Sequence, residues 1–242
     1  MHTTTRLGAL LIALAAGTAT AHADAIADFG AHGHLIISAD RLSPLFSYER
    51  IHAEDNTTQT TDSTWRMSIL WSGQAETIYE APRIGIDYVV APSVTVGGTL
   101  FFTIPFSSTH SVTMNNNTTS RDSTKFDALA LEGRVGYIMP IAPKIAFWPR
   151  GGLSYSRTAT TNPFGNNGDT TSTVISEWAI QLEPMFVYSV TTHFGVQFGP
   201  VLDLPFSGTQ HQELTMGATT TSTDTTLTET HFGITVGLLG EL

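Results

Sequence analysis

Apolar and polar residues alternate with a period of two along most of the chain after residue 33. The clearest stretch is 129–155, in which two alternating runs are separated by a short connection at 140–144. A period of two places successive side chains on opposite faces, as in a β-strand. One face of the two runs is uncharged, and the other carries Glu132, Arg134 and Arg150. The stretch therefore predicts two long strands joined by a tight turn, with the charge on one face.

The same alternation predicts eight strands, at residues 34–51, 77–90, 94–106, 126–139, 145–156, 175–188, 193–206 and 229–242. The parity of the first strand is irregular around Pro44, which indicates a bulge or kink. Residues 65–71 fit a short extension of the wall. Further prolines fall inside the predicted strands and are interpreted as bulge sites, because proline has no N–H for the ladder: Pro82, Pro149, Pro184 and Pro200.

The connections between the strands alternate in length. Short turns at 91–93, 140–144 and 189–192 alternate with long polar segments, interpreted as loops, at 52–64, 107–123, 157–173 and 207–228. This asymmetry is typical of membrane barrels, whose spanning strands need about 9–11 residues. The predicted fold is all-β: an eight-stranded antiparallel up-and-down transmembrane β-barrel with short periplasmic turns and long extracellular loops.

Aromatic residues on the apolar parity fall into two bands. One band precedes the short turns and contains Tyr88, Tyr137 and Tyr188. The other lies near the long polar segments and contains Phe106, Tyr155, Trp178, Phe206 and Phe232. Aromatic rings gather at both water interfaces of a membrane. A soluble sandwich or barrel, the alternative fold, gives no reason for such banding by depth, so the bands are interpreted as two aromatic girdles.

The opposite parity would face the inside of the barrel and carries both signs of charge. Eight strands leave an interior just wide enough to be filled by side chains. Opposite charges packed there would neutralise one another. We therefore expect a structural, charge-paired interior formed by Arg83, Asp87, Glu132, Arg134, Arg150, Glu183 and Asp203.

The start of the chain predicts export. Residues 1–23 resemble a cleaved signal peptide, with Arg6, a short apolar run and the small-x-small site Ala21-His22-Ala23, which leaves 24–242 as one barrel domain. The chain has no cysteine and a net charge of −10, which excludes disulfides and thiolate metal sites and argues against nucleic-acid binding. The expected location is the outer membrane of a Gram-negative cell envelope.

The sequence offers weak signals for chemistry. His32 and His34 could form a metal pair, but further ligands are not evident. His110 and Ser111 with Asp122 do not form a recognisable catalytic triad. His52, His211 and His231 are interpreted as scattered rim and loop residues rather than as a pH-responsive or metal cluster. No catalytic, metal or cofactor site is therefore expected, and the chain is not expected to be an enzyme.

From about residue 31 onward, the pattern resembles small bacterial outer-membrane barrels of the OmpA, OmpX and OmpW type. The repeated phrases Ala81-Pro82-Arg83-Ile84-Gly85 and Trp148-Pro149-Arg150-Gly151-Gly152 resemble a little-characterised group within that superfamily. The resemblance implies fold and location, and it says little about activity. Expected partners are outer-membrane lipid and the barrel assembly machinery, with no nucleic acid and an unidentified partner for the extracellular loops.

The predicted function is a structural or surface-interaction role with a filled interior. A small passive, porin-like channel is the alternative, supported by glycines on the interior parity at positions such as Gly85, Gly152 and Gly237. A lipid-modifying outer-membrane enzyme is a second alternative. A continuous lumen would favour the channel, whereas a lumen blocked by arginine–carboxylate pairs would favour the structural role.

Overall fold

The computed structural model describes residues 29–54, 59–67, 78–103, 109–114, 117–122, 124–164 and 169–242, and it describes the backbone alone for Pro44, Arg66, Met67, 109–114 and 117–122. The predicted signal peptide and Phe106 therefore lie outside the described part. The strands are β1 (Leu35–Glu54), β2 (Gln59–Met67), β3 (Arg83–Ala91), β4 (Val94–Thr103), β5 (Thr109–Met114), β6 (Asn117–Asp122), β7 (Lys125–Tyr137), β8 (Met139–Ala142), β9 (Ile145–Phe164), β10 (Asp169–Ser189), β11 (Phe194–Met216) and β12 (Thr219–Glu241).

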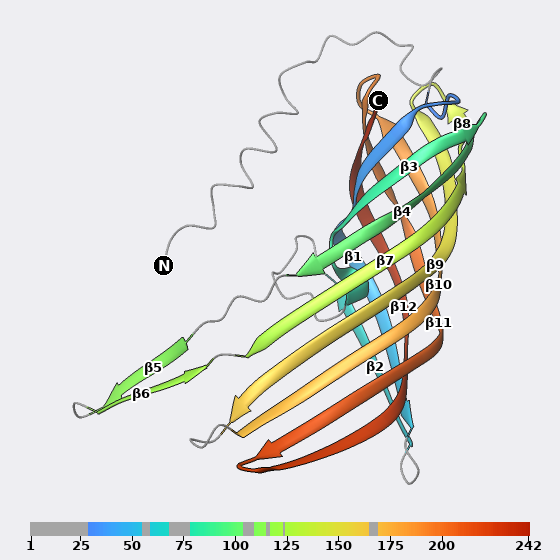
Figure 1. The fold of residues 1–242 in the computed structure, drawn as a ribbon. Coiled ribbons are helices and arrows are strands. Elements are labelled where there is room, and N and C mark those ends of the chain that lie inside the picture. The colour runs from blue at the N-terminus through green and yellow to red at the C-terminus, as the bar shows by residue number, and fades with distance from the viewer. Residues whose placement is uncertain are drawn as a thin grey trace.

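Eight of the described strands close into a ring. The order around it is β1-β3-β4-β7-β9-β10-β11-β12, and β12 returns to pair with β1, every neighbour being antiparallel. Figure 1 shows the tilted strands of this barrel. The remaining wall strands lie off the ring: β8 pairs with β9, and β2 pairs with β1. The predicted eight-stranded antiparallel barrel is confirmed.

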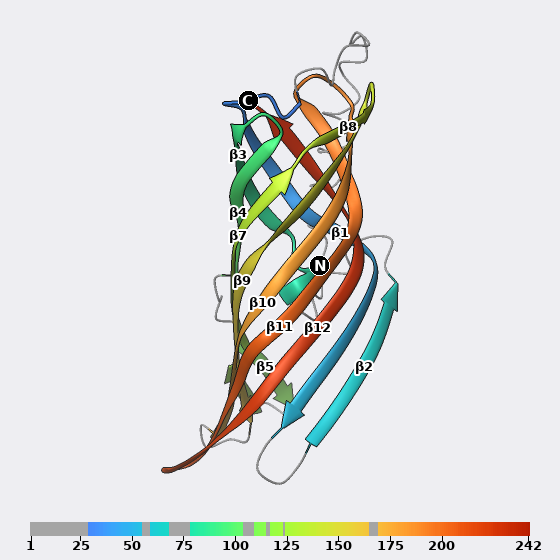
Figure 2. The same cartoon turned by 90° about the vertical axis from the view of Figure 1, so that its right-hand side faces the viewer.

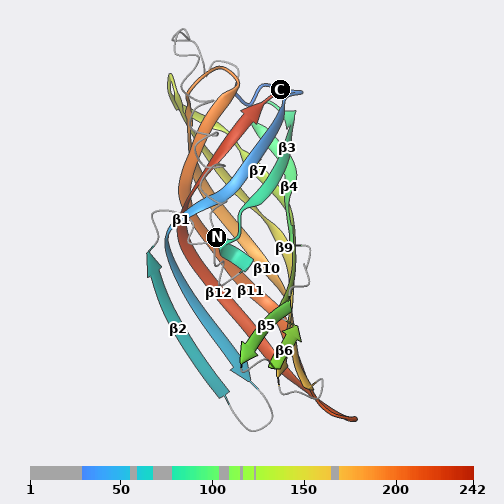
Figure 3. The same ribbon diagram turned by 90° about the vertical axis from the view of Figure 1, so that its left-hand side faces the viewer.

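The two ends of the barrel differ. One end, called here the short-turn rim, carries the connections at 92–93, 143–144 and 190–193 together with Leu242, and lies at the top of Figure 1. The other end, the long-strand rim, carries the extended ends of β9–β12 and the β1–β2 hairpin (Figure 2). The shorter β5–β6 hairpin forms a separate two-stranded sheet (Figure 3).

Side chains are sorted by face as the parity predicts. On β10, Leu182 is 44% exposed whereas the next residue, Glu183, is 1% exposed. The exposed residues of the wall form an apolar belt that includes Ile84, Ile86, Leu131, Val135, Leu153, Leu182 and Phe198. A water-soluble barrel would place these side chains inside and its charges outside. No helix among the described residues is long and apolar enough to cross a membrane.

Several segments predicted as loops are strands. β9 continues to Phe164, β10 begins at Asp169, and β11 and β12 together cover almost all of 207–228, while 52–64 contains the end of β1 and the start of β2. Those loop predictions are wrong, and the predicted strand ends are too short. In these segments both faces are polar, so no hydrophobic alternation marks them. Their abundant threonine nevertheless favours strands.

The first strand contains two irregularities. The β1–β12 register shifts between Ala39 and Ser43 and again between Pro44 and Phe46, so the predicted bulge near Pro44 is present. Within the first shift Arg41 has a φ of 55°, in the left-handed region. Because this conformation breaks the alternation, the consecutive residues Asp40 and Arg41 are both buried inside.

The four other prolines predicted as bulge sites do not lie at register shifts: Pro82, Pro149, Pro184 and Pro200. Pro149 lies opposite Pro184 in an unbroken β9–β10 register, Pro200 lies opposite Ile234 without a shift, and Pro82 precedes β3. The β10–β11 ladder instead skips a few residues between Leu182 and Phe186 and then resumes in the same register. The skipped part brings Pro184 opposite Pro200, where neither residue has an N–H to donate.

The segment before β1 closes the short-turn rim. Phe29 is buried there, edge-on to Trp148 with ring centroids 6.1 Å apart, within an apolar cluster that includes Ile138. The Gly30 N–H donates to Glu241 Oε1 at 3.0 Å, and the Ser93 N–H donates to the Gly30 carbonyl at 3.2 Å. These contacts hold an apolar seal across this end of the lumen.

Gly30→Ala tests this seal. Gly30 has a φ of 84°, and an added methyl would lie 2.9 Å from Ile138 Cδ1. We expect the free energy of unfolding in detergent, measured with urea, to fall by about 1–2 kcal/mol because the left-handed conformation is costly for alanine. Gly133→Ala is the control, since Gly133 has nothing within 4 Å of the added methyl. Equal stability of the two variants would contradict the seal.

Candidate functional site

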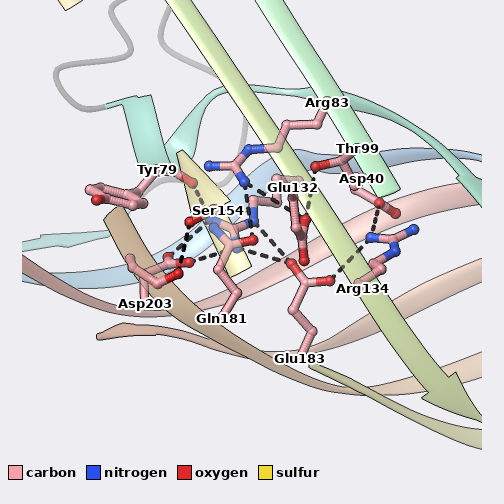
Figure 4. A network of polar contacts seen from close by, with 12 residues as sticks. Asp40, Tyr79, Arg83, Thr99, Glu132, Arg134, Ser154, Gln181, Glu183 and Asp203 are labelled. Carbon is pink, nitrogen blue, oxygen red and sulfur yellow. Dashed lines mark hydrogen bonds and ion pairs between the residues drawn. The ribbon is translucent and has the colours of Figure 1, made fainter. Parts of the chain in front are cut away.

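A network of buried charges lies inside the barrel (Figure 4), and Arg134 contacts three of its carboxylates. Arg134 donates from Nε and Nη2 to the two oxygens of Asp87, at 3.0 and 2.5 Å, in a bidentate pair. Its Nη1 donates to Asp40 Oδ2 at 2.7 Å and lies 3.4 Å from Glu183 Oε2. One guanidinium therefore joins carboxylates from β1, β3 and β10.

Glu183 forms ion pairs with three arginines from three different strands. Arg150 Nη2 lies 2.8 Å from Glu183 Oε2, and Arg41 Nη2 donates to Glu183 Oε1 at 2.9 Å, in addition to the Arg134 contact. The Arg150 guanidinium also lies over the Trp148 ring, 4.5 Å from its centroid. This cation–π contact joins the charge network to the apolar seal.

Toward the long-strand rim, Asp203 links Arg41 to His231. Arg41 donates to both oxygens of Asp203, at 3.0 and 3.1 Å. His231 Nδ1 lies 3.0 Å from Asp203 Oδ2, and its Nε2 lies 3.9 Å from Glu80 Oε1. A histidine oriented by a carboxylate is half of a hydrolytic site. Here the second ring nitrogen faces the carboxylate of Glu80 rather than a serine or cysteine.

Arg83 and Glu132 are held by neutral groups as much as by each other. Arg83 Nη1 lies 4.0 Å from Glu132 Oε2 and donates to Gln181 Oε1 at 3.3 Å. The Thr99 hydroxyl donates to Glu132 Oε2 at 2.8 Å. These contacts tie β3, β4, β7 and β10 together across the lumen.

A short turn that folds into the barrel occupies the next layer of the lumen, beside His231. It is the 3-10 turn η1 (Ile78–Glu80), which precedes β3 and is buried along its length, visible as a short teal coil within the barrel in Figures 2 and 3. The Tyr79 ring stacks on His231, with centroids 6.0 Å apart and planes 11° apart. Arg41 Nη1 donates to the Tyr79 carbonyl at 2.6 Å. A small cavity between Tyr79, Glu80, Arg41 and His231 remains beside the turn.

All seven residues of the expected interior cluster lie inside the barrel, and each is at most 7% exposed: Arg83, Asp87, Glu132, Arg134, Arg150, Glu183 and Asp203. Sequence reasoning missed Asp40 and Arg41, whose irregular parity was the only signal. It also missed the pairing of His231 with Asp203, which comes from neighbouring strands whose register the sequence does not specify. Gln197 completes the set with a hydrogen bond from Nε2 to Asp40 Oδ1.

The two aromatic bands lie on the outer surface. Tyr88, Tyr137 and Tyr188 are exposed near the short-turn rim, while Trp178, Phe206 and Phe232 are exposed toward the other end. Tyr155 is partly covered by Trp178, with ring centroids 5.0 Å apart. Trp65, which belongs to neither predicted aromatic band, joins the second band through its contact with Tyr48, with ring centroids 4.4 Å apart.

The weaker chemical signals are not brought together. His34 Nδ1 lies 2.9 Å from Glu241 Oε1, His52 bonds Thr61, and His211 bonds Asp224, so these histidines lie apart from the buried His231. The side chains of His110, Ser111 and Asp122 lie outside the described part. Within the described ranges, no group of three or more histidines or acidic residues is arranged to hold a metal ion.

No protein-family model matches the sequence, and no curated protein matches it. Among solved structures, the chain is similar to the outer membrane protein OprG from Pseudomonas aeruginosa, with 14% identity and a TM-score of 0.42 over 86% of this chain and 96% of that one. The outer membrane protease OmpT from Escherichia coli matches with 10% identity and a TM-score of 0.40 over 87% and 97%. Ail, the attachment invasion locus protein of Yersinia pestis, matches with 10% identity and a TM-score of 0.31 over 86% and 99%. Similarity at this level concerns the barrel fold.

Proposed function

We propose that this chain is a non-conducting outer-membrane barrel with a structural or surface-interaction role. In this proposal the barrel anchors the extended sheet of β9–β12 beyond the membrane, where it is available to partners. The lumen supplies stability and blocks the passage of solutes. The cleaved signal peptide and the barrel assembly machinery belong to the same proposal, as the means of export and insertion.

The apolar belt supports the membrane placement. Ile84, Val135 and Leu153 are each more than half exposed on the outer wall of a closed ring. A closed ring pairs its backbone groups internally, which hydrocarbon requires because it offers no hydrogen-bond partners. The tyrosines at the short-turn rim and the tryptophans at the other rim lie where membrane interfaces favour aromatic rings.

The observation that carries the non-conducting role is the filled lumen. Arg134 of β7 and Glu183 of β10 each form an ion pair with β1 across the lumen, through Asp40 and Arg41 respectively. The turn η1 occupies the level beyond them, and Phe29 seals the short-turn rim. Two of the interior glycines that supported the channel alternative, Gly85 and Gly237, are closely packed by neighbouring side chains. A methyl at Gly85 would lie 2.7 Å from Arg134 Nη2, and one at Gly237 would lie 2.9 Å from Gln197 Nε2. These glycines make room for the polar side chains.

Conductance in a planar bilayer tests the proposal. The mature chain is folded into detergent, and folding is verified by gel electrophoresis, in which the band of the folded barrel migrates differently before and after boiling. We then expect a quiet baseline without stable conductance steps, because three successive barriers block the lumen. Stable steps of uniform size would instead support the small passive channel. In that case a bulkier lumen residue, Thr235→Tyr, should change the step size, whereas Ile86→Val on the outer belt should not.

A further inference from the structure

A four-residue arrangement occurs twice at the long-strand rim. In the β1–β2 hairpin, Tyr48 lies opposite Trp65 and Arg50 lies opposite Ser63. In the β9–β10 hairpin, Tyr155 lies opposite Trp178 and Arg157 lies opposite Ser176. Both copies therefore have the pattern Tyr-x-Arg on one strand, paired with Ser-x-Trp on the antiparallel neighbour. We call the two copies the Tyr–Trp–Arg–Ser quartets.

The aromatic halves of the quartets have similar geometry. The rings of Tyr48 and Trp65 have centroids 4.4 Å apart and planes at 43°. The rings of Tyr155 and Trp178 have centroids 5.0 Å apart and planes at 48°. Trp65 is 67% exposed and Trp178 is 48% exposed, although both are large apolar groups. Each pair thus presents ring surface to the outside at the edge of the apolar belt.

The arginine of each quartet lies two residues beyond the tyrosine on the same strand, closer to the long-strand rim. Two residues along a strand return to the same face, so each arginine shares the outer face with the tyrosine of its quartet. Arg50 and Arg157 are exposed, and within the described ranges neither forms an ion pair with a carboxylate. The four lumen arginines, in contrast, are all buried: Arg41, Arg83, Arg134 and Arg150.

Hydroxyl groups complete the polar half. Tyr48 donates its phenolic hydrogen to Ser63 Oγ at 3.3 Å, which directs the polar tip of the tyrosine toward the level of Arg50. Thr230 of β12 flanks Arg50 on the other side. On the outer face, the carboxylate position closest to Arg157 in the register is Asp127, diagonally across on β7, and Arg157 does not pair with it. Each quartet therefore combines an unneutralised guanidinium with neighbouring hydroxyl donors.

We propose that the two quartets bind phosphate-bearing lipid headgroups of the surrounding membrane leaflet. The guanidinium and the hydroxyls donate to phosphate oxygens, a geometry that arginine suits well. The aromatic pair contacts the upper part of the acyl chains, in continuity with the apolar belt. This inference rests on the membrane placement proposed above. It adds two discrete lipid-binding sites on the outer wall, and these sites are independent of the blocked lumen.

The test uses the full mature barrel in phosphatidylcholine bilayers, after a boiling-dependent gel shift has shown that it is folded. Bromine on lipid acyl chains quenches nearby tryptophan fluorescence, so brominated phosphatidylglycerol and brominated phosphatidylcholine are compared at equal mole fraction. We expect the anionic lipid to quench more strongly, with an apparent enrichment of about fivefold at each quartet, which corresponds to about 1 kcal/mol per basic residue. The variants Trp65→Phe and Trp178→Phe report on the two sites separately.

The double variant R50Q/R157Q should remove the preference, so that both lipids quench alike. Lys144→Gln is the matched control: it removes one positive charge at the short-turn rim, away from both quartets, and should retain the preference. R50K/R157K keeps the charge and should retain part of the enrichment. Equal quenching by both lipids in the wild type, or equal loss in Lys144→Gln, would overturn the proposal.

The source of the phosphate is tested in the same samples. Inorganic phosphate is added at constant ionic strength, with chloride as the reference anion. Quenching by the anionic lipid should stay unchanged, because the aromatic pair favours a phosphate attached to acyl chains. Loss of quenching with phosphate but not with chloride would mean a site for free phosphate, and the lipid proposal would be wrong. Since folding and conductance are measured separately, failure here is distinguishable from failure of the proposed function.

Discussion

Arg134→Leu should lower the free energy of unfolding by about 3–5 kcal/mol, because it leaves the buried carboxylate of Asp87 without a cation and removes one cation from two others. Asp87 loses both of its hydrogen bonds from the guanidinium, and Asp40 and Glu183 each lose one of their arginines. The leucine cannot donate to any of the three. Urea unfolding in neutral lipid vesicles, followed by β-sheet circular dichroism, measures the effect.

The control is Arg157→Leu, the same chemical change at an exposed position on the outer wall. It should alter the unfolding free energy far less, because water and headgroups already solvate that guanidinium. A second variant separates charge from packing: Arg134→Lys keeps the charge but loses the bidentate contact with Asp87, and should fall between wild type and leucine. If all three variants unfold alike, the ion-pair network does not stabilise the barrel.

Leu182→Arg should cost about 2–4 kcal/mol of stability in a lipid bilayer, because it places a charge in the middle of the apolar belt. Leu182 lies on the outer face of β10, between Trp178 in one aromatic band and Tyr188 in the other. Unfolding by urea in vesicles measures this cost. In a soluble barrel the same exposed position would accept arginine with little change.

Val196→Arg provides a control for depth. Val196 lies directly opposite Tyr188 in the β10–β11 register, so it is at the level of the short-turn aromatic band. The cost of arginine falls to about 0–1 kcal/mol near the interfaces. Both positions are exposed and both are apolar. A cost that is the same at the two depths would argue against a membrane across this belt.

The fold could be predicted because a two-faced strand must alternate when one face meets hydrocarbon and the other a polar lumen. That contrast is strong in β10, where Leu182 and Glu183 occupy opposite faces. It disappears beyond the belt, where both faces of β12 are rich in threonine, and there the strand ends were mistaken for loops. Alternation of apolar and polar residues therefore marks only the part of a strand whose two faces meet different environments.

The interior site could be predicted in outline but not in its connections. Parity assigns Arg134 and Glu183 to the lumen, since each lies in a regular strand. It cannot assign Asp40 and Arg41 together, because consecutive residues share a face only where the backbone departs from regular geometry, as at the left-handed Arg41. Nor does it specify which charges meet, since Arg134 and Asp40 come from strands that are not neighbours in the ring.

The pairing of β1 with β12 has a consequence for how the chain reaches its native state. Leu35 and Leu242 exchange both of their backbone hydrogen bonds, at 3.0 and 2.8 Å, and His34 meets Glu241 across a sequence separation of 207 residues. Closure of the ring thus depends on contacts between residues far apart in the sequence, and contacts of this kind slow folding because the entropy of closing the intervening loop must be overcome first. Until β12 is available, β1 and β11 have open edges of the kind that aggregate. Refolding of the chain is therefore expected to compete with aggregation through these two open edges until β12 pairs with both.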